Sequence, residues 1–133
     1  MWTTIKKRSD FLVATSVGKK FITNSFILQM VKRTENHPVS ANEVRIGFTV
    51  TKKMGGAVVR NRIKRRLREA ARPVFAKHGQ AGHDYVVISR HKALNCDFSE
   101  LIRDMEFAFI KIIHHKGSNS KPSKQSTNSA PKN

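Results

Sequence analysis

Nine basic side chains crowd into residues 52–72 of the 133-residue chain, against one acid, Glu69. They are Lys52, Lys53, Arg60, Arg62, Lys64, Arg65, Arg66, Arg68 and Arg72. Guanidinium and ammonium groups bind phosphate oxygens, so a row of them gives salt-dependent affinity for a polyanion. The formal charge of the whole chain, +17, likewise favours a nucleic acid or an anionic membrane as partner.

The basic segment has the pattern of an amphipathic helix. Gly55-Gly56 breaks the chain before it, and Pro73 disfavours helical geometry in the preceding residue, so we expect a helix over residues 57–72. Its inward stripe at helical spacing is Val59, Ile63, Leu67 and Ala70. The opposite, solvent-facing ridge is Asn61, Lys64, Arg65, Arg68 and Arg72, flanked by Arg60 and Arg62. A merely solvated face usually interleaves acids with bases, so this self-repelling ridge favours phosphate contacts.

The elements that position this helix are expected to form an α/β sandwich with one sheet face partly open. Residues 10–17 fit a short helix capped by Ser9 or Asp10 and ended by Gly18. Residues 21–33 fit one strand or two, with a break near Asn24. Residues 44–51 alternate apolar and polar side chains, so one face packs and the other meets solvent or ligand. The basic helix joins this strand to an apolar strand at 85–89, which makes the two candidates for parallel pairing.

The C-terminal third divides into an amphipathic helix and a polar tail. Asp97 is expected to cap the helix, with Glu100 at the capping-box position. The apolar stripe of this helix is Phe98, Leu101, Ile102, Met105, Phe109 and Ile112. Residues 116–133 have too little apolar surface to fold, so we expect a domain over residues 1–115 and a disordered basic tail after it.

Catalysis by the chain itself has little support in the sequence. No pair of the nine carboxylates has a spacing typical of a two-metal nuclease, and no residue is assigned a catalytic role. His37, His78 and His91 are expected in loops. Cys96 is the only cysteine, which excludes an intrachain disulfide and a cysteine-based metal site and fits a reducing, cytosolic compartment. Neither a membrane span nor a secretory signal is expected.

The run from Ile46 to Ala70 resembles the signature of the bacterial ribonuclease P protein subunit. That family shows a hydrophobic strand ending in Ser-x-Lys-Lys, a Gly, Ala-Val-x-Arg-Asn-Arg-x-Lys-Arg and Arg-Glu. Here Arg60-Asn61-Arg62 matches the Arg-Asn-Arg (RNR) motif. The flanking segments Lys6-Lys7-Arg8-x-Asp10-Phe11 and Asp84 to Arg90 also match, so the resemblance spans Ile5 to Ile113.

The resemblance implies an α+β fold, an α/β sandwich of order αβββαβα in the ribosomal protein S5 domain 2-like arrangement. It implies a mixed, mainly antiparallel sheet with a left-handed βαβ crossover, whereas sequence physics alone favours a right-handed one. The protein would be an accessory in the cytoplasm, its partners being RNase P RNA and precursor tRNA. The RNA subunit would hold the Mg²⁺ and remove the 5′ leader by hydrolysis. No metal on the protein alone, no small-molecule substrate and no membrane are implied.

The resemblance also assigns two sets of RNA-binding residues. The set contacting the catalytic RNA is Arg60, Asn61, Arg62, Lys64, Arg65 and Arg68. The set on the leader side is Phe11, Thr49, Thr51, Lys52, Lys53 and Arg90. Phe11 is either a ring that stacks on a base or a core side chain. Thr15 and Gln29 stand where many relatives carry an aromatic residue.

Two other function classes remain open at this point. A structural ribosomal protein would share the charge, the size and the tail, but it has no reason to carry the whole RNR run. A stand-alone nuclease would need a cluster of carboxylates or histidines, which the sequence does not offer.

Overall fold

The structure is a computed structural model that describes residues 3–114. The five strands are β1 (Thr3–Thr4), β2 (Lys19–Ile22), β3 (Phe26–Lys32), β4 (Arg45–Thr49) and β5 (His83–Ser89). The three α-helices are α1 (Arg8–Val17), α2 (Ala57–His78) and α3 (Phe98–His114), and two short 3-10 turns are η1 (Lys52–Met54) and η2 (His91–Ala93). The predicted tail at 116–133 lies outside the described residues, so the predicted domain boundary stays a prediction.

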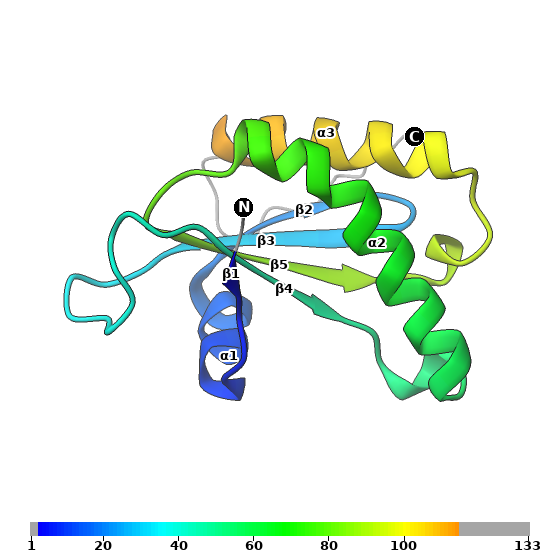
Figure 1. The fold of residues 1–133 in the computed structure, drawn as a ribbon, viewed down its shortest axis with the longest axis horizontal. Coiled ribbons are helices and arrows are strands. Elements are labelled where there is room, and N and C mark those ends of the chain that lie inside the picture. Colours follow the sequence, from blue (N-terminus) through cyan, green and yellow to red (C-terminus); the bar gives the residue numbers. More distant parts are fainter. Residues whose placement is uncertain (1–2, 115–133) are drawn as a thin grey trace.

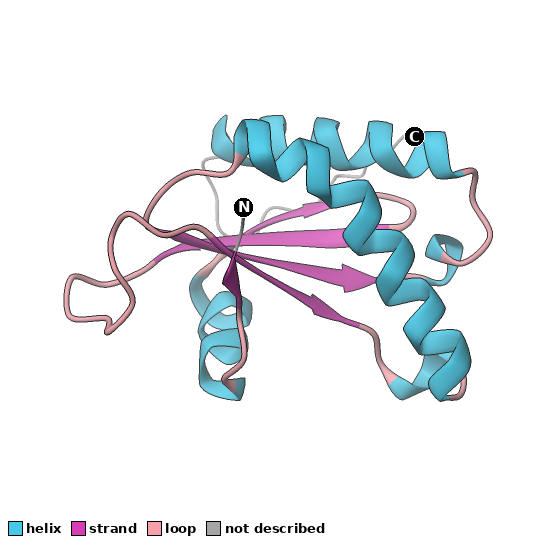
Figure 2. Cartoon of the chain, viewed as in Figure 1, coloured by secondary structure: helices cyan, strands magenta, loops and turns pink. Residues whose placement is uncertain are grey.

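The strands form one mixed sheet between two layers of helices. The strand order is β1-β4-β5-β3-β2, with α2 and α3 on one face and α1 on the other (Figure 1 and Figure 2). The antiparallel pairs β2–β3 and β3–β5 contain four and seven pairs of facing residues. The parallel pairs β1–β4 and β4–β5 contain two and five pairs of facing residues. The predicted α+β fold class and the parallel pairing across the basic helix are confirmed, and the hand of that crossover stays a prediction.

The main core lies between the sheet and the helices α2 and α3. Strand residues facing that side alternate with residues facing α1, as a period of two requires. An aromatic trio locks the layers together: the ring of Phe75 lies 5.4 Å from that of Tyr85 and 5.7 Å from that of Phe109. Tyr85 and Phe109 stack at 4.9 Å, and the Tyr85 hydroxyl accepts a hydrogen bond from the Gln80 N–H at 3.0 Å. This packing fixes α2 on the sheet.

The prediction that the basic helix ends at residue 72 is wrong, because α2 continues through Pro73 to His78. Val74 and Phe75 extend the inward stripe and are 4% and 5% exposed, so their burial favours another turn and a half of helix. Pro73 itself lies on the exposed side of α2, as does Glu69. The missing N–H of Pro73, which would have donated to the Glu69 carbonyl, therefore falls on the exposed side of the helix and not in the core.

Other boundaries differ from the predicted ones in smaller ways. Helix α1 begins two residues earlier than expected, with Lys7 at its N-cap position and no side-chain cap, so the predicted caps Ser9 and Asp10 are wrong. The break between β2 and β3 falls at residues 23–25, as predicted. In α3, Phe98 is 39% exposed rather than part of the buried stripe. The two-residue strand β1 was not predicted, because so short a segment has no periodicity.

Candidate nucleic-acid interface

One face of β4 meets α1 at three successive alternate residues. Arg45 reaches the start of α1, Gly47 lies under the Phe11 ring, and Thr49 lines an open groove. A Cβ added at Gly47 would lie 2.7 Å from two Phe11 ring carbons, so glycine is required for this close approach. The polar face predicted for this strand is therefore largely covered by α1, and only its Thr49 end stays open.

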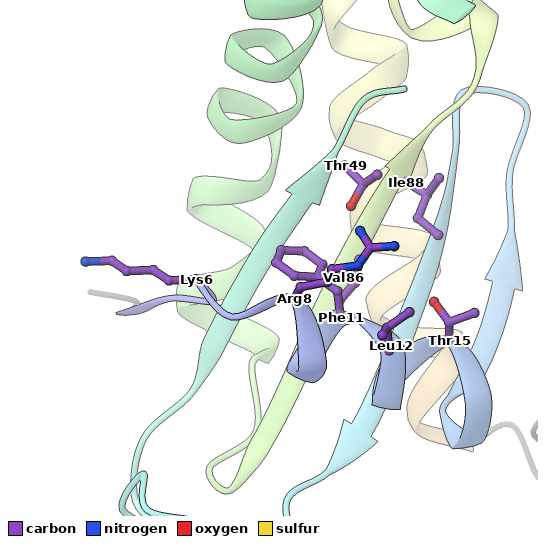
Figure 3. Close-up of a pocket in the computed structure, with 8 residues that line it drawn as sticks. All are labelled: Lys6, Arg8, Phe11, Leu12, Thr15, Thr49, Val86 and Ile88. Carbon is purple, nitrogen blue, oxygen red and sulfur yellow. The ribbon is translucent and has the colours of Figure 1, made fainter. Parts of the chain in front are cut away.

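The groove beside α1 has a volume of about 370 Å³. It is lined by Lys6, Arg8, Phe11, Leu12, Thr15, Thr49, Val86 and Ile88 (Figure 3). The sheet contributes an apolar floor through Val86 and Ile88, and Figure 3 shows Arg8 reaching over the groove while Lys6 points away from it. An apolar floor with the Arg8 cation above it suits an unpaired nucleotide strand, since bases pack on the apolar surface and a phosphate binds the guanidinium.

The leader set divides between this groove and the surface next to it. Phe11 and Thr49 line the groove. Phe11 is half-buried against the small cluster of Ile5, Ala14 and Val86, so it is a packing residue and a groove residue at once. The other members are exposed beyond the ends of β4 and β5: Thr51, Lys52, Lys53 and Arg90.

Six lining residues were absent from the predicted set: Lys6, Arg8, Leu12, Thr15, Val86 and Ile88. The two from β5 could have been found, because residues 86 and 88 share a face with each other and lie opposite the core residues 85 and 87. Lys6 precedes α1 and Arg8 is its first residue, and no periodic pattern marks either of them. Gln29 is buried, and its alternation with Leu28 and Met30 places it on the α1 side of the sheet.

The ridge on α2 faces solvent as predicted. Asn61, Arg62, Arg65 and Arg72 are exposed, while Arg60, Lys64 and Arg68 are half-buried. The Arg60 Nε donates to the Gly55 carbonyl at 3.1 Å, which ties this side chain to the start of the helix. The geometry confirms the exposed ridge, and its contact with RNA stays a prediction.

Arg66 differs from its neighbours on α2. Its Nε donates to the Ala93 carbonyl at 2.9 Å, and its NH2 donates to the Cys96 carbonyl. The guanidinium also lies 5.9 Å from the centre of the Phe98 ring. Arg66, one of the nine bases of residues 52–72 but outside the predicted ridge, therefore anchors the segment that follows β5.

The groove and the start of α2 lie at the same end of the sheet. Strands β4 and β5 are parallel, so Thr49 and Ile88, which pair in register, both lie near their carboxyl ends. The chain leaves β4 through η1 and enters α2 at that same end (Figure 1). A polyanion along the Arg60–Arg68 half of α2 would thus pass close to the groove mouth.

A buried ion cluster ties α1 to the opposite end of the strands. Asp84, 3% exposed, accepts from Arg45 at 2.9 and 2.6 Å and from Arg33 at 2.6 Å. The Arg45 NH2 also lies 3.3 Å from the Asp10 carboxylate, which lies 3.2 Å from the His37 Nε2. Arg45 was expected on a face open to solvent or ligand and is 5% exposed, because α1 covers it. His37, expected in a loop, joins that loop to α1.

This cluster does not fit a metal ion, although Asp10, His37 and Asp84 bring one donor atom each within 4.8 Å of one another. Both Asp84 oxygens already bind guanidinium groups, which a divalent cation would have to displace. The His37 Nδ1 accepts from the Val39 N–H at 3.0 Å, so its Nε2 carries the proton that faces Asp10. The cluster holds α1 in place through ion pairs.

The carboxyl of Asp10 makes the cluster sensitive to acid. Burial raises its pKa, but the hydrogen bond from His37 and the charge of Arg45 outweigh burial, so the pKa is lowered from 3.8. A lowered pKa stabilises the fold above the unfolded-state pKa of about 3.9, and that stability is lost as pH falls through the folded-state value.

We therefore expect Asp10→Asn to cost about 1 to 2 kcal/mol in free energy of unfolding at pH 7. The gap between variant and wild type should close as the pH falls below 4, which urea unfolding at both pH values would measure. The same gap at pH 7 and in acid would contradict the ionic role of Asp10.

Gly47→Ala should disturb the groove without touching α2. Its new Cβ overlaps the Phe11 ring, so we expect a loss of about 1 to 3 kcal/mol in free energy of unfolding and a displaced ring. Gly56→Ala is the matched control, because no atom lies within 4 Å of the added Cβ. Urea unfolding of both variants measures the difference, and equal losses would show that Phe11 does not pack on Gly47.

These features define a class of protein: a small basic α+β domain with an arginine-rich helix beside an open groove. Across residues 3–114, no helix is both long and apolar enough to cross a bilayer. A family model described as Ribonuclease P matches residues 3–113. The chain therefore belongs to the ribonuclease P protein family, as the resemblance predicted.

Relatives and solved structures agree with this assignment. The chain is 42% identical over 108 residues to the ribonuclease P protein component of Paramagnetospirillum magneticum, covering 81% of this chain and 80% of the relative. It is 44% identical over 108 residues to that of Caulobacter vibrioides, covering 81% and 69%. The Staphylococcus aureus RNase P protein superposes with a TM-score of 0.66 at 28% identity, covering 85% and 96%. The Thermotoga maritima RNase P protein superposes with a TM-score of 0.65 at 25% identity, covering 86% of this chain and 98% of that chain. A ribonuclease P protein component is part of an endoribonuclease complex, which implies an RNA partner for this chain.

Proposed function

We propose that this protein is the subunit of ribonuclease P that binds the catalytic RNA through α2 and the 5′ leader of precursor tRNA in the groove beside α1. It thereby assists the Mg²⁺-dependent removal of the leader in the cytoplasm. The observation that supports this most is the shared end of the sheet, where the groove mouth and the start of the basic helix lie together. One RNA–protein complex can then engage both surfaces.

The two surfaces suit different parts of the RNA. On α2, the guanidiniums of Arg62 and Arg65 and the Asn61 amide are exposed to solvent, which suits contact with the phosphate-lined surface of a folded RNA. In the groove, Phe11 and the sheet floor offer apolar area for bases, and Arg8 offers a cation for the backbone. Half of the lining residues, Phe11, Leu12, Val86 and Ile88, have no side-chain group that could hydrogen-bond a base edge, so the proposal predicts leader binding with little sequence preference.

Hydrolysis is assigned to the RNA subunit rather than to side chains of the protein. Mg²⁺ held by that RNA would stabilise the charge that develops on the phosphate oxygens. Among residues 3–114, the one cluster with three candidate ligand atoms is occupied by arginines and does not fit a cation. The protein's contribution is to neutralise phosphates and to hold the leader in line with the RNA.

Cleavage of precursor tRNA at low Mg²⁺ tests this proposal. The assay compares protein alone, RNase P RNA alone, and the two together. We expect cleavage to be strongly stimulated only when both are present, because the protein replaces Mg²⁺ in screening the phosphates. Cleavage by protein alone would point to a stand-alone nuclease, and absence of stimulation would point to a structural RNA-binding protein.

A further inference from the structure

A basic turn lies beside α2, between β5 and α3. Arg90, His91, Lys92 and Asn95 are exposed on it, and its centre is the 3-10 turn η2. Of these, only Arg90 belongs to a predicted RNA-binding set. The turn is closed internally by the Ala93 N–H, which donates to the Arg90 carbonyl at 3.0 Å, and by the Cys96 N–H, which donates to the Lys92 carbonyl at 3.0 Å.

The turn is fastened to the rest of the fold on two sides. On one side Arg66 of α2 donates to the carbonyls of Ala93 and Cys96. On the other side the β2–β3 connection holds it: the Arg90 N–H donates to the Ser25 carbonyl at 2.9 Å, and the Arg90 NH1 donates to the Thr23 carbonyl at 2.9 Å. A basic loop anchored at both ends presents its charges in a fixed place, which lowers the entropy cost of binding.

The Nε and NH2 groups of Arg66 donate hydrogen bonds to this turn. Arg62, one helical turn earlier, lies on the same side of α2 and is exposed. The exposed charge of α2 at Arg62 thus continues onto the turn at Lys92, because Arg66 holds the two segments together. Charges on adjoining segments attract the same stretch of phosphates more strongly than either does alone.

We propose that residues 91–95 of the turn are a further contact surface for the RNA that α2 binds, with Lys92 binding a backbone phosphate and Arg66 positioning the turn. The inference rests on the proposed function only in requiring RNase P RNA as the partner. A guanidinium reaches both carbonyls at once through its planar fork, which an ammonium on a flexible stem cannot reproduce. The positive charge of the side chain at residue 66 is therefore less important than the planar shape of its guanidinium group.

The salt dependence of affinity for RNase P RNA tests Lys92. We expect Lys92→Ala to reduce the slope of log affinity against log salt by about 0.7 to 0.9, which is the loss of one phosphate contact. The affinity itself should fall about fourfold at about 0.15 M salt by the same relation. Lys32→Ala is the matched control, because Lys32 is exposed at the far end of β3. An unchanged slope for Lys92→Ala would overturn the proposal.

A double-mutant cycle tests Arg66. Arg66→Lys keeps the charge, so a direct phosphate contact would leave the slope unchanged, whereas a positioning role predicts a loss like that of Lys92→Ala. In the Lys92→Ala background, Arg66→Lys should then add almost nothing, because the contact that it positions is already absent. Full additivity of the two losses would overturn the positioning role. Thermal unfolding of each variant shows whether it is folded. If Arg66→Lys does not fold, Lys92→Ala still tests the contact with RNA, because Lys92 is exposed and its replacement leaves the fold intact.

Failure of this inference is distinguishable from failure of the proposed function. If wild-type protein binds RNase P RNA and stimulates cleavage while Lys92→Ala is indistinguishable from it, only the inference fails. If the wild-type protein does not bind this RNA, the proposed function fails first.

Discussion

Replacing Arg62, Arg65 and Arg68 together with alanine should weaken binding of RNase P RNA by about 100-fold at about 0.15 M salt. All three lie on the side of α2 away from the core, two of them exposed and Arg68 half-buried. Each phosphate contact contributes about 0.7 to 0.9 to the salt slope, so the triple variant should lose about 2 to 3 in slope. Filter binding or fluorescence titration across a salt series measures both quantities.

The control must remove equal charge elsewhere. Lys32, Lys77 and Lys111 are exposed and lie outside both predicted RNA-binding sets. Their triple alanine variant has the same net charge as the ridge variant, so it separates specific contacts from the general field of a basic protein. We expect the ridge variant to bind far more weakly than this control at low salt, and the gap to close near 1 M salt. Equal losses in the two variants would mean that α2 makes no ordered set of contacts.

Asp84→Asn should destabilise the fold more than Asp10→Asn or any change to an exposed charged residue. Asp84 neutralises two guanidiniums that are themselves 8% and 5% exposed, Arg33 and Arg45. Removing one partner of a buried ion pair leaves uncompensated charge and typically costs about 3 to 5 kcal/mol. For a domain of this size each kcal/mol lowers Tm by about 4 °C, so Tm should fall by about 12 to 20 °C.

Glu69→Gln provides the matched comparison, because it removes a carboxylate from an exposed pair. Glu69 and Arg72 lie 3.4 Å apart with side chains 51% and 59% exposed. Exposed pairs contribute about 0 to 1 kcal/mol, so Tm should hardly move. Calorimetry of both variants tests the contrast, and a Tm for Asp84→Asn within a few degrees of the wild type would refute the structural role of the buried cluster.

The parts of the fold that follow local periodicity could be predicted from the sequence. The ridge on α2 followed from a period of 3.6, and the open face at Thr49 followed from a period of two. The end of α2 could not be predicted by the same means. Pro73 is a local stop signal, but burial of Val74 in the core and of Phe75 against Tyr85 and Phe109 is a tertiary effect that outweighs it.

The parts of the candidate site that were missed depend on contacts between distant segments. Arg45 and Asp84 are 39 residues apart, and Asp10 and His37 are 27 apart, so no window of sequence joins them. Arg66 belongs to the same run of bases as the ridge residues, and only the placement of the Ala93 and Cys96 carbonyls shows that it anchors the following turn. Charge alone thus identified the kind of partner but not the role of each base.

In the proposed function, the groove beside α1 holds the 5′ leader while α2 holds the catalytic RNA. The most direct measurement is the affinity of RNase P RNA, with and without this protein, for precursor tRNA and for mature tRNA lacking the leader. We expect the protein to tighten binding of precursor tRNA and to leave binding of mature tRNA nearly unchanged, and we expect Gly47→Ala to reduce this selectivity. An equal gain for both tRNAs would contradict it, because the protein would then be acting without contact to the leader.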